Sequence, residues 1–324
     1  MRAILPCTNN DAVKKLVTTA IYSHPDCQRH EMGEWHPECP ARLQAIADQL
    51  INAHIDDLLE HREAPLADLA DIARNHTPNA IAIVQTRPHE GDDYYPIDGD
   101  TSMNRHSYTA ALRAAGAAVA ATDAVIDGEI ENAFCAIRPP GHHARPSVPM
   151  GFCLFNNVAI AARHALDVRG LQRVAIVDFD VHHGNGTEEA FRDEPRVLMA
   201  SFFQHPFYPY CEPLPITPNR INVPVPAGTK GDVVRQLVQD QWLPALHAFK
   251  PQMLFISAGF DAHREDDLAG MGLVEADYAW MTQQLMDIAK RYAQGRIVSC
   301  LEGGYNLSAL GRSVVAHVKA LAEI

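Results

Sequence analysis

The feature that most constrains this sequence is a short, mainly apolar run, residues 173–177, that ends directly in Asp178-Phe179-Asp180-Val181-His182-His183. Such a run is typical of a strand buried on both faces of a parallel sheet. Residues two apart on an extended strand end point the same way, so Asp180 and His182 are expected to converge just beyond the strand. A carboxylate and an imidazole there would be two of the three protein ligands of a catalytic zinc site. Taken alone, the pattern fits equally well a polar strand end that caps the next helix.

Three further apolar runs also end in residues with useful chemistry. They are residues 133–137 before His142-His143, residues 253–256 before Asp261, and residues 297–301 before Glu302-Gly-Gly-Tyr305. Tandem histidines straight after a Pro-Pro-Gly turn are hard to explain as purely structural residues. Ligands collect at the carboxyl ends of strands in an open parallel sheet, so the four strand exits are expected to meet.

Segments with helical spacing separate these strands. The expected helices are residues 41–55, 75–85, 108–126, 158–166, 233–249, 276–293 and 308–322, and the other expected strands are residues 18–23, 197–203 and 221–225. This alternation predicts one α/β domain, residues 1–324, with a doubly wound, mostly parallel sheet flanked by helices. The long polar connection 87–104 is expected to border a site or to be a disordered acidic link. Its acidic residues are Glu90, Asp92, Asp93, Asp98 and Asp100.

Composition narrows the class of protein. The chain has 324 residues and a formal net charge of −13, and no basic stretch is long enough to form a nucleic-acid groove, so we expect no direct binding of DNA or RNA. An acidic surface attracts cationic substrates such as lysine-rich peptides or polyamines, although a general solubility charge accounts for it better. The seven cysteines are odd in number and form no close CxxC pair, which argues against disulfides and against structural zinc.

The sequence also bears on location. Residues 1–10 lack the charged and then apolar pattern of a secretory signal, and no run of about 18 apolar residues is present, so we expect neither a signal peptide nor a membrane span. These expectations favour a cytoplasmic protein. The sequence leaves open whether the chain forms a homo-oligomer.

Together the four strand exits offer the parts of an amide hydrolase. Asp180, His182 and Asp261 would hold one zinc ion and leave a position open for water or substrate, which is the pattern of catalytic zinc. Such an ion lowers the pKa of bound water towards about 7 and polarises a carbonyl group. His142 and His143 would take the proton of the water and later give one to a leaving amine.

Three more side chains complete the expected mechanism. Tyr305 follows two glycines and would donate a hydrogen bond to the developing oxyanion. Asp178 is expected to hold the Nδ1–H of one tandem histidine, and Asn185 that of the other. A carboxylate partner makes an imidazole more basic than an amide partner does, so the two histidines should not be equivalent.

The four motifs resemble those of the zinc-dependent histone deacetylase and acetylpolyamine amidohydrolase superfamily, which has the arginase–deacetylase fold. The matching segments are Arg-Pro-Pro-Gly-His-His from residue 138, Asp-Phe-Asp-Val-His-His-Gly-Asn-Gly-Thr from 178, Ser-Ala-Gly-Phe-Asp from 257 and Leu-Glu-Gly-Gly-Tyr-Asn from 301. The similarity extends from His36-Pro37-Glu38 to the last expected helix. It is closest to the class II type, because Glu302 and Asn185 stand where class I members carry Gly and Asp.

The resemblance implies a role for individual residues. By motif, the zinc ligands are Asp180, His182 and Asp261, the catalytic pair is His142 and His143 with His143 as general base, and the oxyanion donor is Tyr305. Phe152, after Gly151, matches one wall of an acetyl-lysine tunnel, whose other wall would be Phe207 or Tyr208. Asp100 matches the rim residue that holds the substrate's backbone amide. A structural potassium ion is implied beside the zinc, at Asp178, Asp180, His182, Ser201 and Phe202.

One departure from the family pattern concerns the substrate. Family members often have Asp-Pro-Leu after the third ligand, whereas this chain has Asp266-Asp267-Leu268. Polyamine-selective relatives of the class II type place Glu where Leu268 stands. Leu268 therefore favours deacylation of lysine side chains in proteins or peptides, while the acidic rim keeps an acetylpolyamine deacetylase as an alternative.

Two other readings remain at this point. An arginase-like binuclear manganese enzyme would need further acids where Gly184 and His263 stand. A catalytically inactive module that binds acyl groups is the alternative from another class, and the intact histidines and Tyr305 count against it. The resting metal is also open, since two carboxylates and one imidazole accept iron or cobalt as well as zinc.

Overall fold

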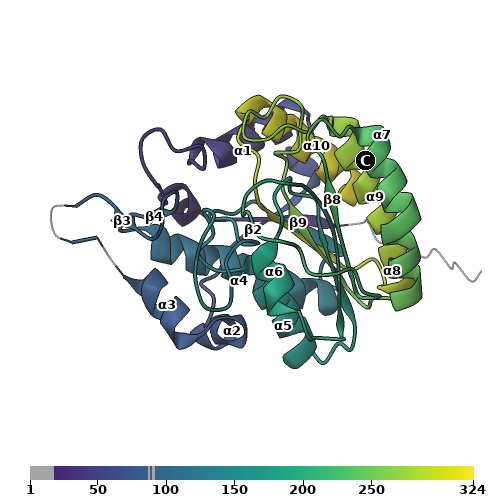
Figure 1. The fold of residues 1–324 in the computed structure, drawn as a ribbon, viewed down its shortest axis with the longest axis horizontal. Coiled ribbons are helices and arrows are strands. Elements are labelled where there is room, and N and C mark those ends of the chain that lie inside the picture. The colour runs from purple at the N-terminus through teal and green to yellow at the C-terminus, as the bar shows by residue number, and fades with distance from the viewer. Residues whose placement is uncertain (1–17, 87, 90–91) are drawn as a thin grey trace, which may run out of the picture.

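The computed structural model describes residues 18–86, 88–89 and 92–324, and its centre is one eight-stranded sheet (Figure 1). Every strand pair in this sheet is parallel, in the order β2-β1-β5-β10-β9-β6-β7-β8. The strands are β1 (Thr19–Ser23), β2 (Glu60–Glu63), β5 (Asn132–Cys135), β6 (Val174–Asp178), β7 (Val197–Gln204), β8 (Arg220–Val225), β9 (Leu254–Ala258) and β10 (Ile297–Leu301). The expected doubly wound parallel sheet is confirmed.

Helices cover both faces of the sheet (Figure 1). On one face α4 and α5 pack together, with α2 and α3 beside them, and on the other face α1, α9 and α10 pack together, with α7 and α8 beside α9. The helices are α1 (Ala41–Asn52), α2 (Leu69–Asn75), α3 (Pro78–Gln85), α4 (Ser107–Ile126), α5 (Asn157–Asp167), α6 (Asn185–Ala190), α7 (Gly231–Leu237), α8 (Leu243–Phe249), α9 (Glu275–Tyr292) and α10 (Leu307–Ala322).

Burial on both faces explains the composition of the central strands. Every residue of β5, β6, β7, β9 and β10 is buried, and these strands are mainly aliphatic and aromatic. Each buried aliphatic or aromatic side chain contributes about 1.5–3 kcal/mol to folding. β2 differs because it lies at the edge of the sheet, where its polar residues alternate between half-buried and exposed. It contains no apolar run, so the sequence did not predict it as a strand.

The strand order places the chemically important strand exits next to one another. The four strands whose ends carry the predicted motifs, β5, β10, β9 and β6, are consecutive in the sheet. Residues within one position of the four strand ends are also in register, with Cys135 beside Cys300, Cys300 beside Ser257, and Ser257 beside Asp178. Four chain segments that are far apart in sequence therefore reach the same edge at the same height.

Several predicted elements differ in detail. The expected helix 75–85 begins three residues later, at Pro78, because Thr77 caps it through a hydrogen bond from the Ala80 amide. Asn75 instead ends α2, a separate helix that was not expected. The expected helix 233–249 contains a π-helical turn, Val238–Trp242, between α7 and α8. The connection 87–104 holds a small antiparallel hairpin of β3 (Tyr95–Pro96) and β4 (Ser102–Met103). The short helix α6 was not expected.

Helix α4 bears on the expectation of no membrane span. In the part of the chain that the structure describes, α4 is long and apolar enough to cross a membrane, but 67% of its apolar stretch is buried inside the protein. Helices in the core of a soluble protein meet the same criterion of length and composition. The expectations for residues 1–10, Cys7, Arg87 and Glu90 lie outside the described residues.

Gly116 in α4 gives a test of the packing on this face. An added Cβ at this position would lie 2.0 Å from the Pro65 carbonyl oxygen. Ala is intrinsically better than Gly in a helix by about 1 kcal/mol, but the clash with backbone outweighs this. We expect G116A to lower the free energy of unfolding by about 1–3 kcal/mol in urea denaturation. G99A is the control, since nothing lies within 4 Å of its added Cβ; a G116A protein as stable as the wild type would contradict the packing.

Candidate active site

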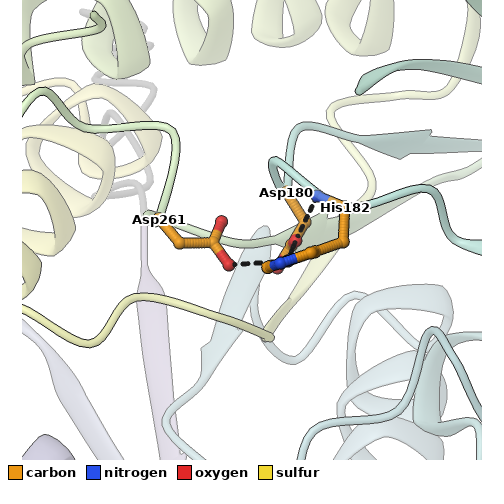
Figure 2. A group of neighbouring side chains, drawn as sticks. All are labelled: Asp180, His182 and Asp261. Atoms are coloured by element: carbon orange, nitrogen blue, oxygen red, sulfur yellow. Dashed lines mark hydrogen bonds and ion pairs between the residues drawn. The ribbon is translucent and has the colours of Figure 1, made fainter. Parts of the chain in front are cut away.

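Three ionisable side chains meet just beyond the ends of β6 and β9 (Figure 2). Asp180 and His182 follow β6, and Asp261 follows β9. The His182 Nδ1 atom lies 3.0 Å from Asp180 Oδ1 and 3.2 Å from Asp261 Oδ2, and one ligand atom from each residue lies within 4.8 Å of the others. The predicted grouping of a carboxylate, an imidazole and a second carboxylate is therefore present.

Backbone amides hold the two carboxylates in place. The Gly303 amide donates to Asp180 Oδ2 at 2.9 Å, and the Val181 amide donates to Asp261 Oδ1 at 2.9 Å. The oxygens that face His182 Nδ1 are Asp180 Oδ1, which also accepts the His182 amide at 2.8 Å, and Asp261 Oδ2. Asp261 Oδ2 is buried and accepts no hydrogen bond.

The cluster fits a divalent metal ion. Ligand atoms about 2.0 Å from a tetrahedral zinc lie about 3.3 Å apart, close to the separations found here. Burial, followed by the charge of Asp180, raises the pKa of Asp261 to about 6, which reflects the cost of two buried carboxylates without a cation between them. Asp180, His182 and Asp261 would hold the ion.

Two glycines make room for these carboxylates. An added Cβ at Gly259 would lie 2.1 Å from Asp180 Oδ2, and one at Gly303 would lie 2.0 Å from Asp261 Oδ2. Any larger residue would push a candidate ligand out of position. The glycines of the Ser-Ala-Gly-Phe-Asp and Glu-Gly-Gly-Tyr segments therefore serve close approach of backbone to side chain.

The tandem histidines lie beside this cluster, and each has its own partner. His142 Nδ1 is 2.9 Å from Asp178 Oδ2, and His143 Nδ1 is 2.8 Å from Asn185 Oδ1. Asn185 donates its amide to the sulfur of Met150, so its oxygen faces the imidazole as acceptor. Both histidines therefore carry their proton on Nδ1 and turn Nε2 towards the site. The pairing expected from sequence is present.

The surroundings of the two histidines give their imidazoles different pKa values. Burial disfavours the charged form of His142, but Asp180 and Asp178 outweigh it and hold the pKa of His142 well above the usual value. Burial, reinforced by the charges of His142 and His182, holds the pKa of His143 well below the usual value. The imidazoles are thus not equivalent, because their surroundings favour the cationic form of His142 and the neutral form of His143.

Glu302 binds the backbone of the turn that carries His142, a contact that the sequence did not predict. Its fully buried carboxylate accepts the Gly141 amide at 2.6 Å, the His142 amide at 3.1 Å and the Ser257 hydroxyl at 3.0 Å. Burial raises its pKa to about 7, although the charge of His142 acts in the opposite direction. This acid thus joins the ends of β5, β9 and β10.

Tyr305 is held over Arg42. The Arg42 guanidinium lies 5.0 Å from the centre of the Tyr305 ring and donates to the carbonyl oxygens of Gly304 and Glu302. Gly304 has φ of +118°, a conformation that favours glycine and lets the chain turn Tyr305 towards the histidines. Burial holds the pKa of the Tyr305 hydroxyl well above the usual value, so it stays protonated and can donate a hydrogen bond.

A cavity of about 200 Å³ leads from the surface to this chemistry. Its walls include every residue predicted to contact the substrate. They also include three of the predicted metal-binding and catalytic residues, and Tyr210, which was not predicted. They are Asp100, Gly151, Phe152, Phe207, Tyr208, Leu268, His143, His182, Tyr305 and Tyr210.

The choice between Phe207 and Tyr208 does not arise, because both line the cavity. The Phe207 ring stacks on His182 with ring centres 5.4 Å apart, and the Tyr208 ring meets His143 edge-on at 5.1 Å. The Tyr208 ring also meets His182 edge-on at 6.1 Å, so both aromatic side chains pack against the imidazoles of the site.

The opposite wall is tied to the rim of the cavity. Phe152 has φ of +65°, and its amide donates to the Thr101 hydroxyl at 3.0 Å. That hydroxyl donates in turn to Asp100 Oδ1 at 3.0 Å. His36 packs edge-on against Phe152 and binds the Asp100 carbonyl oxygen at 3.0 Å. Hydrogen bonds thus connect this wall to the rim.

The positions predicted for potassium lie on adjacent strands. Asp178 of β6 is in register with Ser201 of β7, and the Ser201 hydroxyl donates to Asn222 at 2.9 Å, which leaves its oxygen lone pairs free. The next residue, Phe202, is buried and stacks on Trp242. A potassium ion at these positions stays a prediction.

The arginase-like reading meets a steric obstacle. It needs an acid where Gly184 stands, and a Cβ there would lie 2.3 Å from Asp178 Oδ2. His263, where the other acid would be needed, points to Glu275 at 3.5 Å. These contacts do not favour a second metal ion.

Comparison with known proteins agrees with the geometry. Residues 36–321 match the family described as the histone deacetylase domain. This chain belongs to the histone deacetylase family. It is therefore related to metal-dependent deacetylases and amidohydrolases, and the family resemblance inferred from the motifs is confirmed.

Individual relatives are similar over most of their length. The chain is 38% identical to a probable deacetylase of Archaeoglobus fulgidus, over 90% of this chain and 82% of the relative. It is 37% identical to the histone deacetylase-like amidohydrolase of Pseudomonas aeruginosa, over 83% of this chain and 72% of the relative. The crystal structure of the HD domain of HDA15 superposes with a TM-score of 0.89 at 35% identity and covers 95% of this chain and 89% of that one.

Gly303 gives a test of the metal site that removes no ligand. We expect G303A to lose most of its bound zinc. The added Cβ would lie 2.0 Å from Asp261 Oδ2 and 2.7 Å from Asp180 Oδ2, so both carboxylates would have to move. The measurement is zinc per chain by elemental analysis after equilibration with limiting zinc. D261A should behave in the same way, and G99A should retain about one ion. Full zinc occupancy in G303A would refute this arrangement of ligands.

Proposed function

We propose that this protein is a zinc-dependent deacetylase that removes acetyl or related acyl groups from lysine side chains of proteins or peptides. The observation that carries the proposal is a narrow cavity with aromatic walls that ends at His143, His182 and Tyr305. An acyl-lysine has a long apolar stem and an amide at its tip, and this cavity accommodates both.

The histidines divide the proton transfers. Zinc held by Asp180, His182 and Asp261 would polarise the acyl carbonyl and acidify the attacking water. His143, neutral and with its Nδ1–H held by Asn185, takes the proton of the water at Nε2. After the tetrahedral stage, the same atom returns a proton to the leaving amine. His142, held by Asp178, keeps a positive charge beside the developing negative charge.

Tyr305 supplies the remaining electrostatic help. Its hydroxyl is kept protonated by burial and donates to the acyl oxygen as negative charge grows there. A hydrogen bond that strengthens only in the transition state raises kcat rather than substrate affinity.

Features of the cavity mouth support a peptide substrate. Leu268 lines the cavity and offers no charge to a second amine of a polyamine. Asp100 lies at the rim, where its carboxylate can accept a backbone N–H of an extended peptide. Potassium at the Ser201 positions and a cytoplasmic location belong to the same proposal.

An acetylpolyamine deacetylase is the second candidate. It is favoured by the acidic connection before β4, where Asp92, Asp93, Asp98 and Asp100 are exposed. Such a cluster attracts cations of any kind, so substrate competition has to decide.

The Tyr305 assignment can be tested with a matched tyrosine. We expect Y305F to lower kcat on an acetyl-lysine peptide by about 100- to 1,000-fold with little change in KM, as for loss of an oxyanion donor. Y210F is the control, because Tyr210 lines the same cavity but is 81% exposed. Equal kcat values for the Y305F and wild-type proteins would remove Tyr305 from the mechanism.

The substrate class can be tested by comparing kcat/KM for an acetyl-lysine peptide and for acetylspermidine. We expect the wild type to prefer the peptide, and L268E to shift the ratio towards acetylspermidine by about tenfold, the effect of about 1.4 kcal/mol. L268Q controls for shape without charge. A wild-type preference for acetylspermidine would establish the second candidate instead.

A further inference from the structure

We propose that Asp266 is a positioning residue that fixes Tyr305 and Leu268 relative to each other, and so couples the oxyanion donor to the wall of the acyl cavity. The inference rests on the proposed function of this site. Asp266 belongs to the segment in which this chain departs from the Asp-Pro-Leu pattern.

The carboxylate of Asp266 is buried and accepts three backbone hydrogen bonds. Its Oδ2 atom accepts the amides of Tyr305 at 2.6 Å and Asn306 at 3.0 Å, and its Oδ1 atom accepts the Leu268 amide at 3.1 Å. Only 4% of the residue is exposed, so water competes little for these contacts. One side chain thus joins the loop after β9 to the loop after β10.

Both ends of this link are anchored. The Asp266 amide donates to the His263 carbonyl oxygen at 2.9 Å, two residues after Asp261. On the other side, Asn306 caps α10 by accepting the Ala309 amide at 3.0 Å, and its side chain donates to the Glu265 carbonyl oxygen at 2.8 Å. The link therefore ties the segment that carries Asp261 to the start of a long helix.

The chemical consequence follows from what the two linked residues do. Tyr305 and Leu268 line the same cavity, one at its reactive end and one along its wall. Gly303 and Gly304, just before Tyr305, give the backbone freedom that needs an external restraint. Three N–H donors on one carboxylate supply that restraint without contact between Asp266 and the substrate.

Replacing Asp266 by Asn tests the link directly. The amide has only one acceptor oxygen, so D266N leaves either Leu268 or the Tyr305–Asn306 pair facing an NH₂ group. We expect kcat on an acetyl-lysine peptide to fall about 10- to 100-fold, as for a misplaced catalytic group, with KM changed less than about threefold. D267N is the matched control, since Asp267 is the adjacent, exposed aspartate.

A double-mutant cycle separates positioning from a general structural role. If Asp266 acts through the Tyr305 hydroxyl, D266N should change kcat less than about threefold in a Y305F background, because the group that it positions is gone. An equal loss of kcat in the wild-type and Y305F backgrounds would overturn the proposal, as would wild-type kcat in D266N.

Two further measurements keep the outcome interpretable. Thermal melting compares the stability of D266N with that of D267N. If D266N does not fold, D266E replaces it in the cycle, because this variant keeps the charge but moves it by one methylene. The cycle uses whichever substrate the wild type turns over best. Absence of lysine deacylation by the wild type would contradict the proposed function, whereas a normal wild type with additive variants contradicts only the role of Asp266.

Discussion

The hydrogen bond from the Gly303 amide to Asp180 is the contact on which the rest of the site depends. It joins the loop after β10 to the loop after β6, and the matching bond from Val181 to Asp261 joins β6 to β9. Because backbone donors hold both carboxylates, Asp180 Oδ1, Asp261 Oδ2 and the His182 imidazole face a common point. Two like charges so close together are stable only with a cation between them or with raised pKa values.

Much of the fold could be predicted because a parallel sheet has a simple rule. Buried strands read as apolar runs, and their carboxyl ends lie at one edge, so the residues after residues 135, 178, 258 and 301 had to be neighbours if those strands were adjacent. The predictions of secondary structure that were wrong concern positions where a local cap or a tertiary contact decides the structure. Hydrophobic spacing does not locate the start of α3, which Thr77 and Pro78 fix at residue 78, and β2 forms from polar residues because it pairs with β1 at the edge.

The candidate chemical residues, and the partners Asp178 and Asn185 of the two histidines, could be placed from motifs, but the other supports of the site could not. His142, His143 and Tyr305 stand in conspicuous segments, whereas Glu302, Asp266 and Thr101 act on backbone amides contributed by distant parts of the chain. A side chain that accepts from a backbone N–H places no requirement on the type of residue it contacts. Sequence spacing therefore carries no signal for such contacts, and the Glu302 position in particular became meaningful only through Gly141 and His142.

The hydroxyl of Thr101 bridges Phe152 and Asp100, and this has a consequence for inhibitor design. A ligand that fills the cavity would place its linker against Phe152 and its surface group near Asp100. Since the Thr101 hydroxyl accepts from the Phe152 amide and donates to Asp100, a bulky surface group that shifts Asp100 would also disturb the backbone that carries Phe152. Gains from separate optimisation of linker and surface group should then combine non-additively, so the two halves of such a compound are best varied together.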